Sequence, residues 1–203
     1  FEEAALVEPL SVGMYATQRA RVEPGQTALV LGCGTIGLVT LEALLARGIT
    51  KVIAVDVVDM RIQKAKELGA FYVINPQNED VVKVVKDLTD NKGVHVVFET
   101  AGSVATTQMT VEVVKRGGKV VLIGLPSQAE FNFNIIKTID KELDVLGIFR
   151  YANAYPGCVD LLNSGRVHLK SLITHRFPLE KAQEALLFAH EHKAESIKVV
   201  VNI

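Results

Sequence analysis

The chain of 203 residues has few cysteines and no marked excess of either charge. Its two cysteines, Cys33 and Cys158, lie far apart and form no C-x-x-C pair, which excludes a disulfide framework and a cysteine zinc knuckle. Lys and Arg number 22 against 23 acidic residues, so no global field would attract nucleic acid or an anionic membrane. The expected partner is therefore a small molecule.

The chain also lacks a long apolar run. No uninterrupted stretch approaches the roughly 18 residues of a membrane-spanning helix. The first ten residues, FEEAALVEPL, are acidic, whereas a signal peptide would be basic and apolar. Together with the low cysteine content, these features predict a cytoplasmic protein. The chain opens without Met, which indicates a piece of a longer protein.

Short runs rich in Val and Ile alternate with segments of helical length. Near-continuous apolar runs, rather than alternating apolar and polar residues, indicate strands covered on both faces, as in a parallel sheet. Strands are expected at residues 28–31, 51–57, 71–74, 94–100, 119–124 and 143–149, and helices at 35–47, 60–68, 79–89 and 103–116. The repeated β-α-β order predicts a doubly wound α/β fold with six parallel strands.

Two regions fall outside this repeat. Residues 9–21 are expected to form a lead-in helix. After Arg166 the order changes to an extended piece, an amphipathic helix and a last strand, at residues 171–178, 179–192 and 197–203. Because six strands already complete the sheet, the sequence predicts a sheet domain of residues 1–166. Residues 167–203 are expected to return toward another domain.

A glycine motif follows the first predicted strand. The stretch GCGTIG places Gly32, Gly34 and Gly37 with the spacing G-x-G-x-x-G. In a dinucleotide-binding turn the first glycine permits a sharp bend, the second lets the backbone approach a pyrophosphate, and the third lets the helix pack close to the strand. The helix that begins near Thr35 would direct free N–H groups at the phosphates. Alone, the motif is also compatible with a tight turn that binds nothing.

An acidic residue at the end of the second predicted strand strengthens the hypothesis of a cofactor site. Asp56 follows the motif by about 20 residues, where a carboxylate accepts hydrogen bonds from ribose hydroxyls. Its charge would disfavour a 2′-phosphate, because two unit charges ~4 Å apart repel by roughly 4 kcal/mol at an effective dielectric of ~20. NAD is therefore expected rather than NADP. Arg61 could contact the ribose, form an ion pair with a phosphate, or be an exposed charge on the helix surface.

Several further stretches accompany the motif. In chain order these are EPLSVGMYA, GCGTIG, VDVVDMRIQKAKELGA, VVFETAG, GGKVVLIGLP, GIFRYANAYP and SLITHRFPLEKAQEAL. With this set, which covers most of its length, the chain resembles the coenzyme-binding lobe of the zinc-dependent medium-chain alcohol dehydrogenases, most closely the sorbitol (polyol) dehydrogenase group. The resemblance implies a Rossmann sheet with strand order 3-2-1-4-5-6.

The resemblance also implies an activity and cofactors for the full-length protein. Such enzymes pass a hydride from a secondary alcohol of a polyol, such as sorbitol or xylitol, to NAD and produce a ketose. A zinc ion in a separate N-terminal domain polarises the alcohol. That domain has no counterpart in this sequence, so the chain alone is expected to bind NAD and to catalyse nothing.

The resemblance assigns the cofactor contacts residue by residue. It places the pyrophosphate on Gly34, Thr35, Ile36 and Gly37, with Ile36 also against the nicotinamide, and it places Asp56 and Arg61 at the adenosine ribose. The backbone of three residues near the ends of the fifth and sixth strands would hold the nicotinamide and its carboxamide: Ile123, Leu125 and Ile148. The side chains of these three residues are expected to belong to the core.

Three residues correspond to the family's catalytic region. Glu8 matches a position that contributes to the zinc site directly or through water, although a helix-capping carboxylate would look the same. Arg150 and Tyr151 match positions near polyol hydroxyls, and an interface ion pair is the alternative for Arg150. No histidine has the spacing of a metal ligand.

The family dimerises through its coenzyme lobe, so a homodimer or homotetramer is expected. The segment SQAEFNFNIIKTID alternates Phe and Asn and predicts a half-exposed edge strand at that interface. The alternative is that the returning C-terminal segment covers these Phe rings within one subunit.

Other functions remain open. A threonine or butanediol dehydrogenase of the same family would share the motifs, and a non-catalytic NAD-sensing module would share the glycine turn. A methyltransferase that binds S-adenosylmethionine could also share it, but its usual antiparallel seventh strand is not evident.

Overall fold

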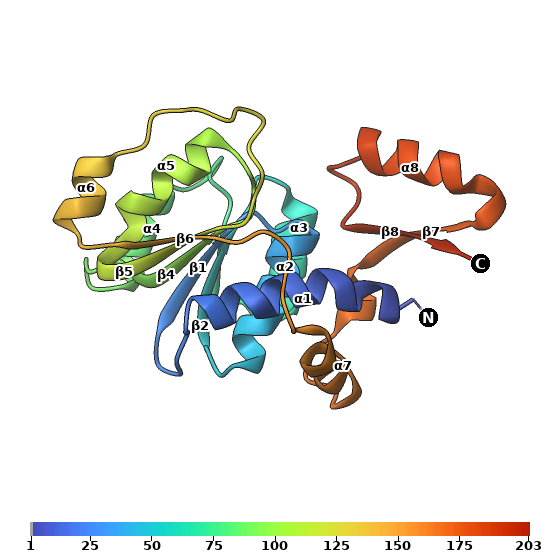
Figure 1. Ribbon diagram of the computed structural model, residues 1–203. Coiled ribbons are helices and arrows are strands. Elements are labelled where there is room, and N and C mark those ends of the chain that lie inside the picture. The colour runs from blue at the N-terminus through green and yellow to red at the C-terminus, as the bar shows by residue number, and fades with distance from the viewer. Residues whose placement is uncertain (1) are drawn as a thin grey trace.

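A six-stranded parallel sheet forms the centre of the molecule in the computed structural model, which describes residues 2–203 (Figure 1). Its strand order is β3-β2-β1-β4-β5-β6, which confirms the expected doubly wound arrangement. The strands are β1 (Thr27–Leu31), β2 (Lys51–Val55), β3 (Tyr72–Ile74), β4 (Val94–Glu99), β5 (Val114–Leu122) and β6 (Asp144–Gly147). A separate two-stranded parallel sheet pairs β7 (Ile173–Pro178) with β8 (Lys198–Asn202).

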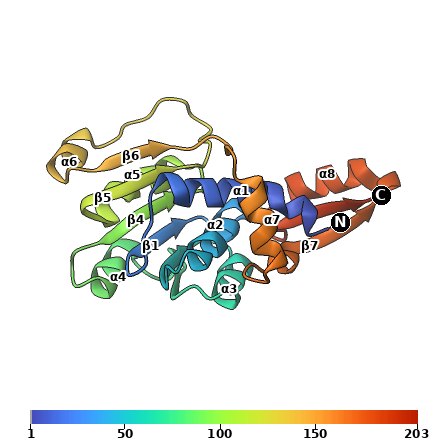
Figure 2. The same ribbon diagram turned by 60° about the horizontal axis from the view of Figure 1, so that its bottom comes forward.

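Helices cover both faces of the large sheet. They are α1 (Ala4–Arg19), α2 (Thr35–Ala46), α3 (Asp59–Glu67), α4 (Val81–Leu88), α5 (Val104–Val113), α6 (Ile135–Asp140), α7 (Tyr155–Asn163) and α8 (Ala182–Glu191). Helices α1, α2 and α7 lie together on one face (Figure 2), and α3 shares their apolar core. Helices α4 and α5 cover the other face.

Burial of both faces explains the continuous apolar strands. In β1, Ala28 and Val30 join the core under α1 and α2, whereas Leu29 and Leu31 join the core under α4 and α5. All four are at most 1% exposed. Because side chains along a strand point alternately to opposite faces, a strand covered on both sides needs apolar residues at every position.

The structure overturns the expected strand within residues 127–140. No strand forms there among the described residues, and residues 135–140 form α6. Asn134 caps this helix, since its side-chain oxygen accepts from the N–H of Lys137 at 2.9 Å. The alternating Phe and Asn residues therefore belong to a loop and a helix start, and the Asn cap outweighs the two-residue periodicity.

Two other helices differ from expectation. The lead-in helix starts at Ala4 rather than at residue 9, and Glu8 is therefore its fifth residue, beyond the first turn where a carboxylate would favour the helix dipole. Helix α7 was not predicted; Pro156 lies in its first turn, where a missing N–H costs nothing.

The segment after Arg166 packs against the sheet domain and extends to one side of it. Val167, Leu169 and Leu172 are buried in the core shared with α1 and α2. Ile173 at the start of β7 and Val200 of β8 join the same core, while the two strands and helix α8 lie to one side of the large sheet (Figures 1 and 2). The expected strand-helix-strand order of this tail is confirmed.

Nothing in the described helices reaches both the length and the apolar character that crossing a membrane requires.

Glu42 of α2 anchors the returning segment through a buried carboxylate. It is 2% exposed; its Oε2 accepts from the backbone N–H of His168 at 2.9 Å, and its Oε1 has no partner. Burial raises the pKa of Glu42, and the hydrogen bond and charge of His168 offset this only in part. A raised folded-state pKa means that stability is fully present below the unfolded value of about 4.3 and is lost as pH rises through the folded pKa.

Glu42→Gln is therefore expected to stabilise the protein at pH 7 by roughly 1 kcal/mol, or about 2–4 °C in Tm, with no gain at pH 4. Gln keeps an acceptor for His168 and removes the buried charge. Thermal unfolding followed by circular dichroism between pH 4 and pH 7 measures the difference, with exposed Glu23→Gln as control. A difference that stays constant with pH would contradict the buried-charge explanation.

Candidate cofactor-binding site

The glycine turn connects the carboxyl end of β1 to the amino end of α2. Gly32 has φ +95°, a conformation that favours glycine. Gly37 lies so close to the preceding turn that a Cβ there would be 1.8 Å from the carbonyl oxygen of Gly32. At Gly34 a Cβ would meet only Arg61, at 4.0 Å, so the space beside this residue is open. The turn thus combines tight internal packing with an open outer surface.

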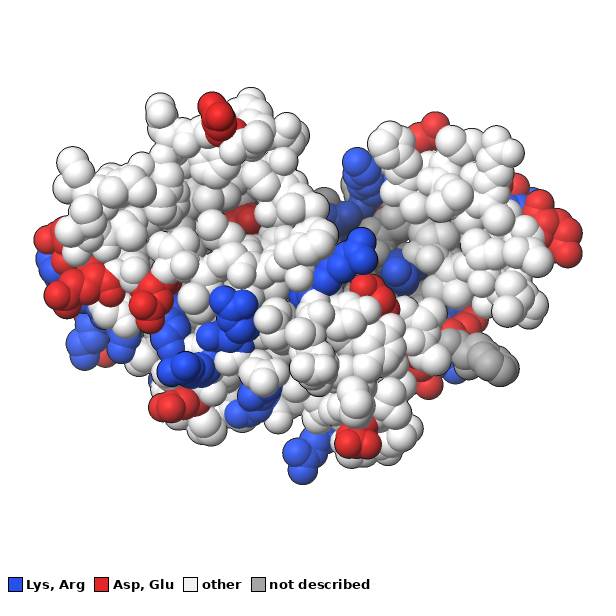
Figure 3. All heavy atoms as spheres, viewed as in Figure 1, with Lys and Arg blue, Asp and Glu red and all other residues white. Residues whose placement is uncertain are grey.

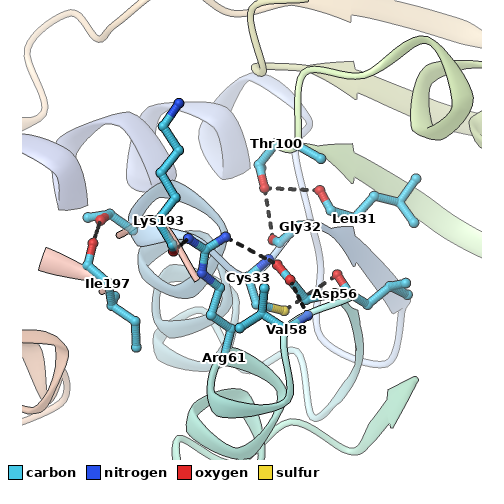
Figure 4. A network of polar contacts seen from close by, with 12 residues as sticks. Leu31, Gly32, Cys33, Asp56, Val58, Arg61, Thr100, Lys193 and Ile197 are labelled. Atoms are coloured by element: carbon cyan, nitrogen blue, oxygen red, sulfur yellow. Dashed lines mark hydrogen bonds and ion pairs between the residues drawn. The ribbon is translucent and has the colours of Figure 1, made fainter. Parts of the chain in front are cut away.

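Loops after β4 and β5 lie beside the glycine turn. The Thr100 hydroxyl donates to the carbonyl oxygens of Leu31 and Gly32 at 3.0 and 2.9 Å (Figure 4). The buried Glu99 carboxylate accepts from the N–H groups of Ala101 and Gly102 at 3.0 and 2.9 Å. The N–H of Gly124, after β5, donates to the carbonyl oxygen of Glu99 at 3.0 Å, so these bonds together hold the carboxyl ends of β1, β4 and β5 at the edge where doubly wound sheets bind ligands. The sequence analysis did not single out Thr100 or Glu99.

Asp56 is fixed at the end of β2 by backbone donors. Its Oδ2 accepts from the N–H of Cys33 at 2.6 Å, and its Oδ1 accepts from the N–H of Val58 at 2.9 Å (Figure 4). The side chain is only 6% exposed. The carboxylate is thus held beside the glycine turn with its remaining lone pairs free for a ligand.

Arg61 of α3 lies between Asp56 and the C-terminal tail. One guanidinium nitrogen is 3.9 Å from Oδ2 of Asp56, while another donates to the carbonyl oxygens of Lys193 and Ser196, the latter at 3.4 Å. The side chain is 20% exposed, so the alternative of an exposed helix charge is wrong. Its Nε is buried without a partner. A buried donor next to an open turn suits an anionic or hydroxyl-bearing ligand.

The tail closes one side of the turn and supplies cations that the sequence analysis missed. The Thr35 hydroxyl donates to the carbonyl oxygen of Ile197 at 2.5 Å. A hollow of about 330 Å³ lies between the turn and the tail, lined among others by Gly34, Arg61, Lys193 and Lys198. Only the tertiary fold brings the two lysines there, because more than 150 residues separate Lys198 from Gly34 in the chain.

Residues assigned to the nicotinamide end lie at the carboxyl ends of β5 and β6. The N–H of Ile123 donates to Glu99 and the N–H of Ile148 donates to Leu122, both at 2.9 Å, so only their carbonyl oxygens could serve a ligand. Ile148 is buried and Ile123 packs against the core, as expected. Leu125 is 78% exposed, so the expectation that its side chain belongs to the core is wrong. Ile36 is half-buried in the first turn of α2.

The three residues assigned to the catalytic region lie away from this turn. Arg150, at φ +58°, is exposed and lies over the Phe149 ring at 5.3 Å. Tyr151 packs on Tyr155 with ring centroids 5.4 Å apart. Partial burial raises the pKa of Tyr155, and the interaction with Tyr151 and the charge of exposed Glu8 raise it further.

Within residues 2–203 no three His, Cys, Asp or Glu side chains come together in a way that could hold a metal ion. The carboxylate of Glu8 alone does not make a zinc site. By contrast, the open glycine turn, the fixed Asp56 carboxylate and the unpartnered Arg61 Nε fit a dinucleotide.

The sheet order and the glycine turn define a dinucleotide-binding domain of the Rossmann type. Residues 35–164 match the family of zinc-binding dehydrogenases, and the chain belongs to this family.

Relatives and solved structures agree with this assignment. Over 201 residues, the chain is 42% identical to sorbitol dehydrogenase of Bacillus subtilis, covering 99% of this chain and 57% of that protein. An Escherichia coli oxidoreductase/dehydrogenase of unknown specificity superposes with a TM-score of 0.94 at 39% identity, covering 98% of this chain and 56% of the other. The 2R,3R-butanediol dehydrogenase of Bacillus subtilis gives a TM-score of 0.90 at 30% identity, covering 98% and 57%. The chain thus spans little more than half the length of these proteins.

Proposed function

We propose that this chain is the NAD-binding part of a zinc-dependent dehydrogenase that oxidises a secondary hydroxyl of a polyol, such as sorbitol or xylitol, to a ketose. The observation that carries the proposal is the Asp56 carboxylate, which backbone bonds hold beside an open glycine turn. A ribose diol suits this acceptor, whereas a 2′-phosphate would be repelled. The similarity to sorbitol dehydrogenase supports the polyol as substrate.

In the proposed complex, the residues of this chain bind and orient the cofactor. The first N–H groups of α2 have no partner within the helix and face the pyrophosphate together with Lys198. Asp56 accepts from the ribose, and carbonyl oxygens after β5 and β6 orient the nicotinamide edge. NAD, when bound, would be the hydride acceptor. The zinc ligands would come from outside this chain, with Glu8 contributing directly or through water.

Substrate recognition is proposed for the Arg150 and Tyr151 region. A guanidinium and a phenol can hydrogen-bond hydroxyl groups, whereas a simple apolar alcohol would leave them unpaired. The deciding experiment measures NAD reduction by the full-length protein at 340 nm with sorbitol, xylitol, threonine and butanediol. Preference for the polyols supports the proposal. Preference for threonine or butanediol would place the protein in another branch, and NAD binding without turnover of any alcohol would indicate a sensing module.

Lys198→Gln is expected to weaken NAD binding about tenfold, because a charge-assisted contact to a phosphate contributes about 1.5–3 kcal/mol. The loss should shrink as salt is raised, since ions screen the interaction. Isothermal titration calorimetry at two salt concentrations measures it, with the exposed Lys170→Gln as matched control on the same tail. If Lys198→Gln and the parent bind NAD with equal affinity, Lys198 does not contact the cofactor.

We further propose that the protein forms a homodimer or homotetramer through the edge at β6. Strand β6 has a free side in the sheet, and large apolar side chains surround it. These are Ile135 (57% exposed), Ile136 (81%), Ile139 (71%), Val145 (41%) and Phe149 (73%). An exposed apolar edge of this kind suits a second copy, which can continue the sheet.

Ile136→Glu is expected to shift the oligomer toward monomer without unfolding it, because the side chain already faces solvent in a single chain. Sedimentation velocity measures the change, with Phe71→Glu before β3, at the opposite edge of the sheet and 50% exposed, as a comparison. A parent protein that sediments as a monomer would contradict the proposal.

The division into a cofactor domain of residues 1–166 and a returning segment of residues 167–203 also stays a proposal. Exposed Leu186, Leu187 and Ile203 support it, since they leave an apolar surface for another domain to cover.

A further inference from the structure

A second hollow lies at the amino ends of β4 and β5, whereas the glycine turn lies at the carboxyl ends of the strands. It has a volume of about 540 Å³ and is bounded by the end of α4, the loop before β4, the start of β5, and α6. Its lining contains six cationic side chains, Lys86, Lys92, Lys115, Arg116, Lys137 and Lys141. We call it the basic hollow. Figure 3 shows Lys and Arg side chains gathered at the lower left of the molecule, with several acidic ones nearby.

Three of the six cations already have partners in the protein. Lys137 forms an ion pair with Glu112, and Arg116 pairs with Asp140 at 2.8 Å. Lys141 donates to the carbonyl oxygens of Val111 and Val114, both at 2.7 Å, and thereby caps the end of α5.

The other three cations have no carboxylate within 4.0 Å among residues 2–203: Lys86, Lys92 and Lys115. Helices α4 and α5 both end at this hollow, and each C-terminus contributes roughly half a negative charge. Six cations still exceed Glu112, Asp140 and the two helix ends by about three charges. Burial lowers the pKa of Lys141, the charge of Glu112 opposes this, and the charges of Lys137, Lys86 and Arg116 lower the pKa further, so several like charges lie near this amine.

We propose that the basic hollow binds a compact phosphorylated metabolite, at a site separate from the cofactor turn. Lysines bind phosphate as point charges, and a ligand with about three negative charges would neutralise the unpaired ones. The volume lies within the range of about 300–1,000 Å³ usual for small-molecule sites. A long polyanion is disfavoured, because the net charge of −1 gives the whole chain no attractive field. The side chain of Asn91, which also lines the hollow, offers a neutral donor.

The test titrates the protein with inorganic pyrophosphate and follows backbone amide shifts by NMR in 150 mM salt. Because pyrophosphate also resembles the centre of NAD, the two sites must be separated. Shifts of Asn91 and Gly93 report the basic hollow, and shifts of Gly34 and Thr35 report the cofactor turn. Lys86→Gln with Lys115→Gln is expected to weaken the first set at least tenfold and to leave the second unchanged. Lys198→Gln should do the reverse.

Lys66→Gln with Lys170→Gln removes two exposed lysines elsewhere and should change neither set. Unfolding temperatures verify that each variant is folded. The proposal is overturned if pyrophosphate shifts only Gly34 and Thr35. It is also overturned if shifts of Asn91 and Gly93 persist at the same affinity in Lys86→Gln with Lys115→Gln, or vanish in 150 mM salt as general counterion binding would.

Discussion

Gly37→Ala is expected to destabilise the protein by at least ~4 kcal/mol, a large part of the stability of an ordinary domain. The added Cβ would lie 1.8 Å from the carbonyl oxygen of Gly32 and 2.9 Å from the Thr100 hydroxyl. The first of these atoms belongs to the backbone, and the second already donates to Leu31 and Gly32. No side-chain rotation can relieve the overlap, so α2 must move away from β1. Urea unfolding measures the loss.

Gly34→Ala provides the matched control within the same turn. At Gly34 a Cβ has only Arg61 within reach, at 4.0 Å, and φ is −68°, which alanine adopts without strain. Stability should therefore change by no more than about 1 kcal/mol. NAD binding should nevertheless weaken at least tenfold, because the methyl group would occupy the place where a pyrophosphate approaches the backbone. A folded Gly34→Ala protein that binds NAD as well as the parent would disprove the phosphate site.

Asp56→Asn is expected to reduce the preference for NAD over NADP by about 100-fold. A carboxylate ~4 Å from a 2′-phosphate is repelled by roughly 4 kcal/mol at an effective dielectric of ~20, and the neutral amide removes this repulsion. Part of the expected gain in NADP affinity is lost, because Asn has only one acceptor oxygen for the two N–H donors of Cys33 and Val58. A stability loss of about 1.5–3 kcal/mol should accompany the change. Calorimetric titration with each nucleotide measures both affinities.

Asp59→Asn is the appropriate comparison, since Asp59 lies three residues after Asp56, at the start of α3, and its carboxylate accepts from the side chain of Asn75 at 2.8 Å. This variant should leave the nucleotide preference unchanged. If Asp56→Asn stays folded and discriminates between NAD and NADP as the parent does, Asp56 does not contact the ribose.

Much of the fold could be predicted because it depends on local pattern. Strands β1, β2 and β4 are short apolar runs that burial on both faces requires, and glycines at positions such as Gly48 (φ +84°) end the helices between strands. The prediction failed at residues 127–140, where a single Asn cap determines a helix start within an alternating pattern. It also failed for Leu125, because exposure depends on which loop covers a position, and periodicity carries no such information.

The sequence by itself determined the six strand segments, the helices α2 to α5 between them and the turn of Gly32, Gly34 and Gly37, since each of these elements depends on residues close together in the chain. It also identified Asp56, because the carboxyl ends of adjacent parallel strands meet at one edge. Only the tertiary structure decided that Lys198 joins the cofactor hollow, that Arg61 is shared between Asp56 and the tail, and that lysines from α4, β5 and α6 converge on the basic hollow. Those groups come from segments far apart in the chain. Local preferences do not set their distance, which follows from how the segments pack.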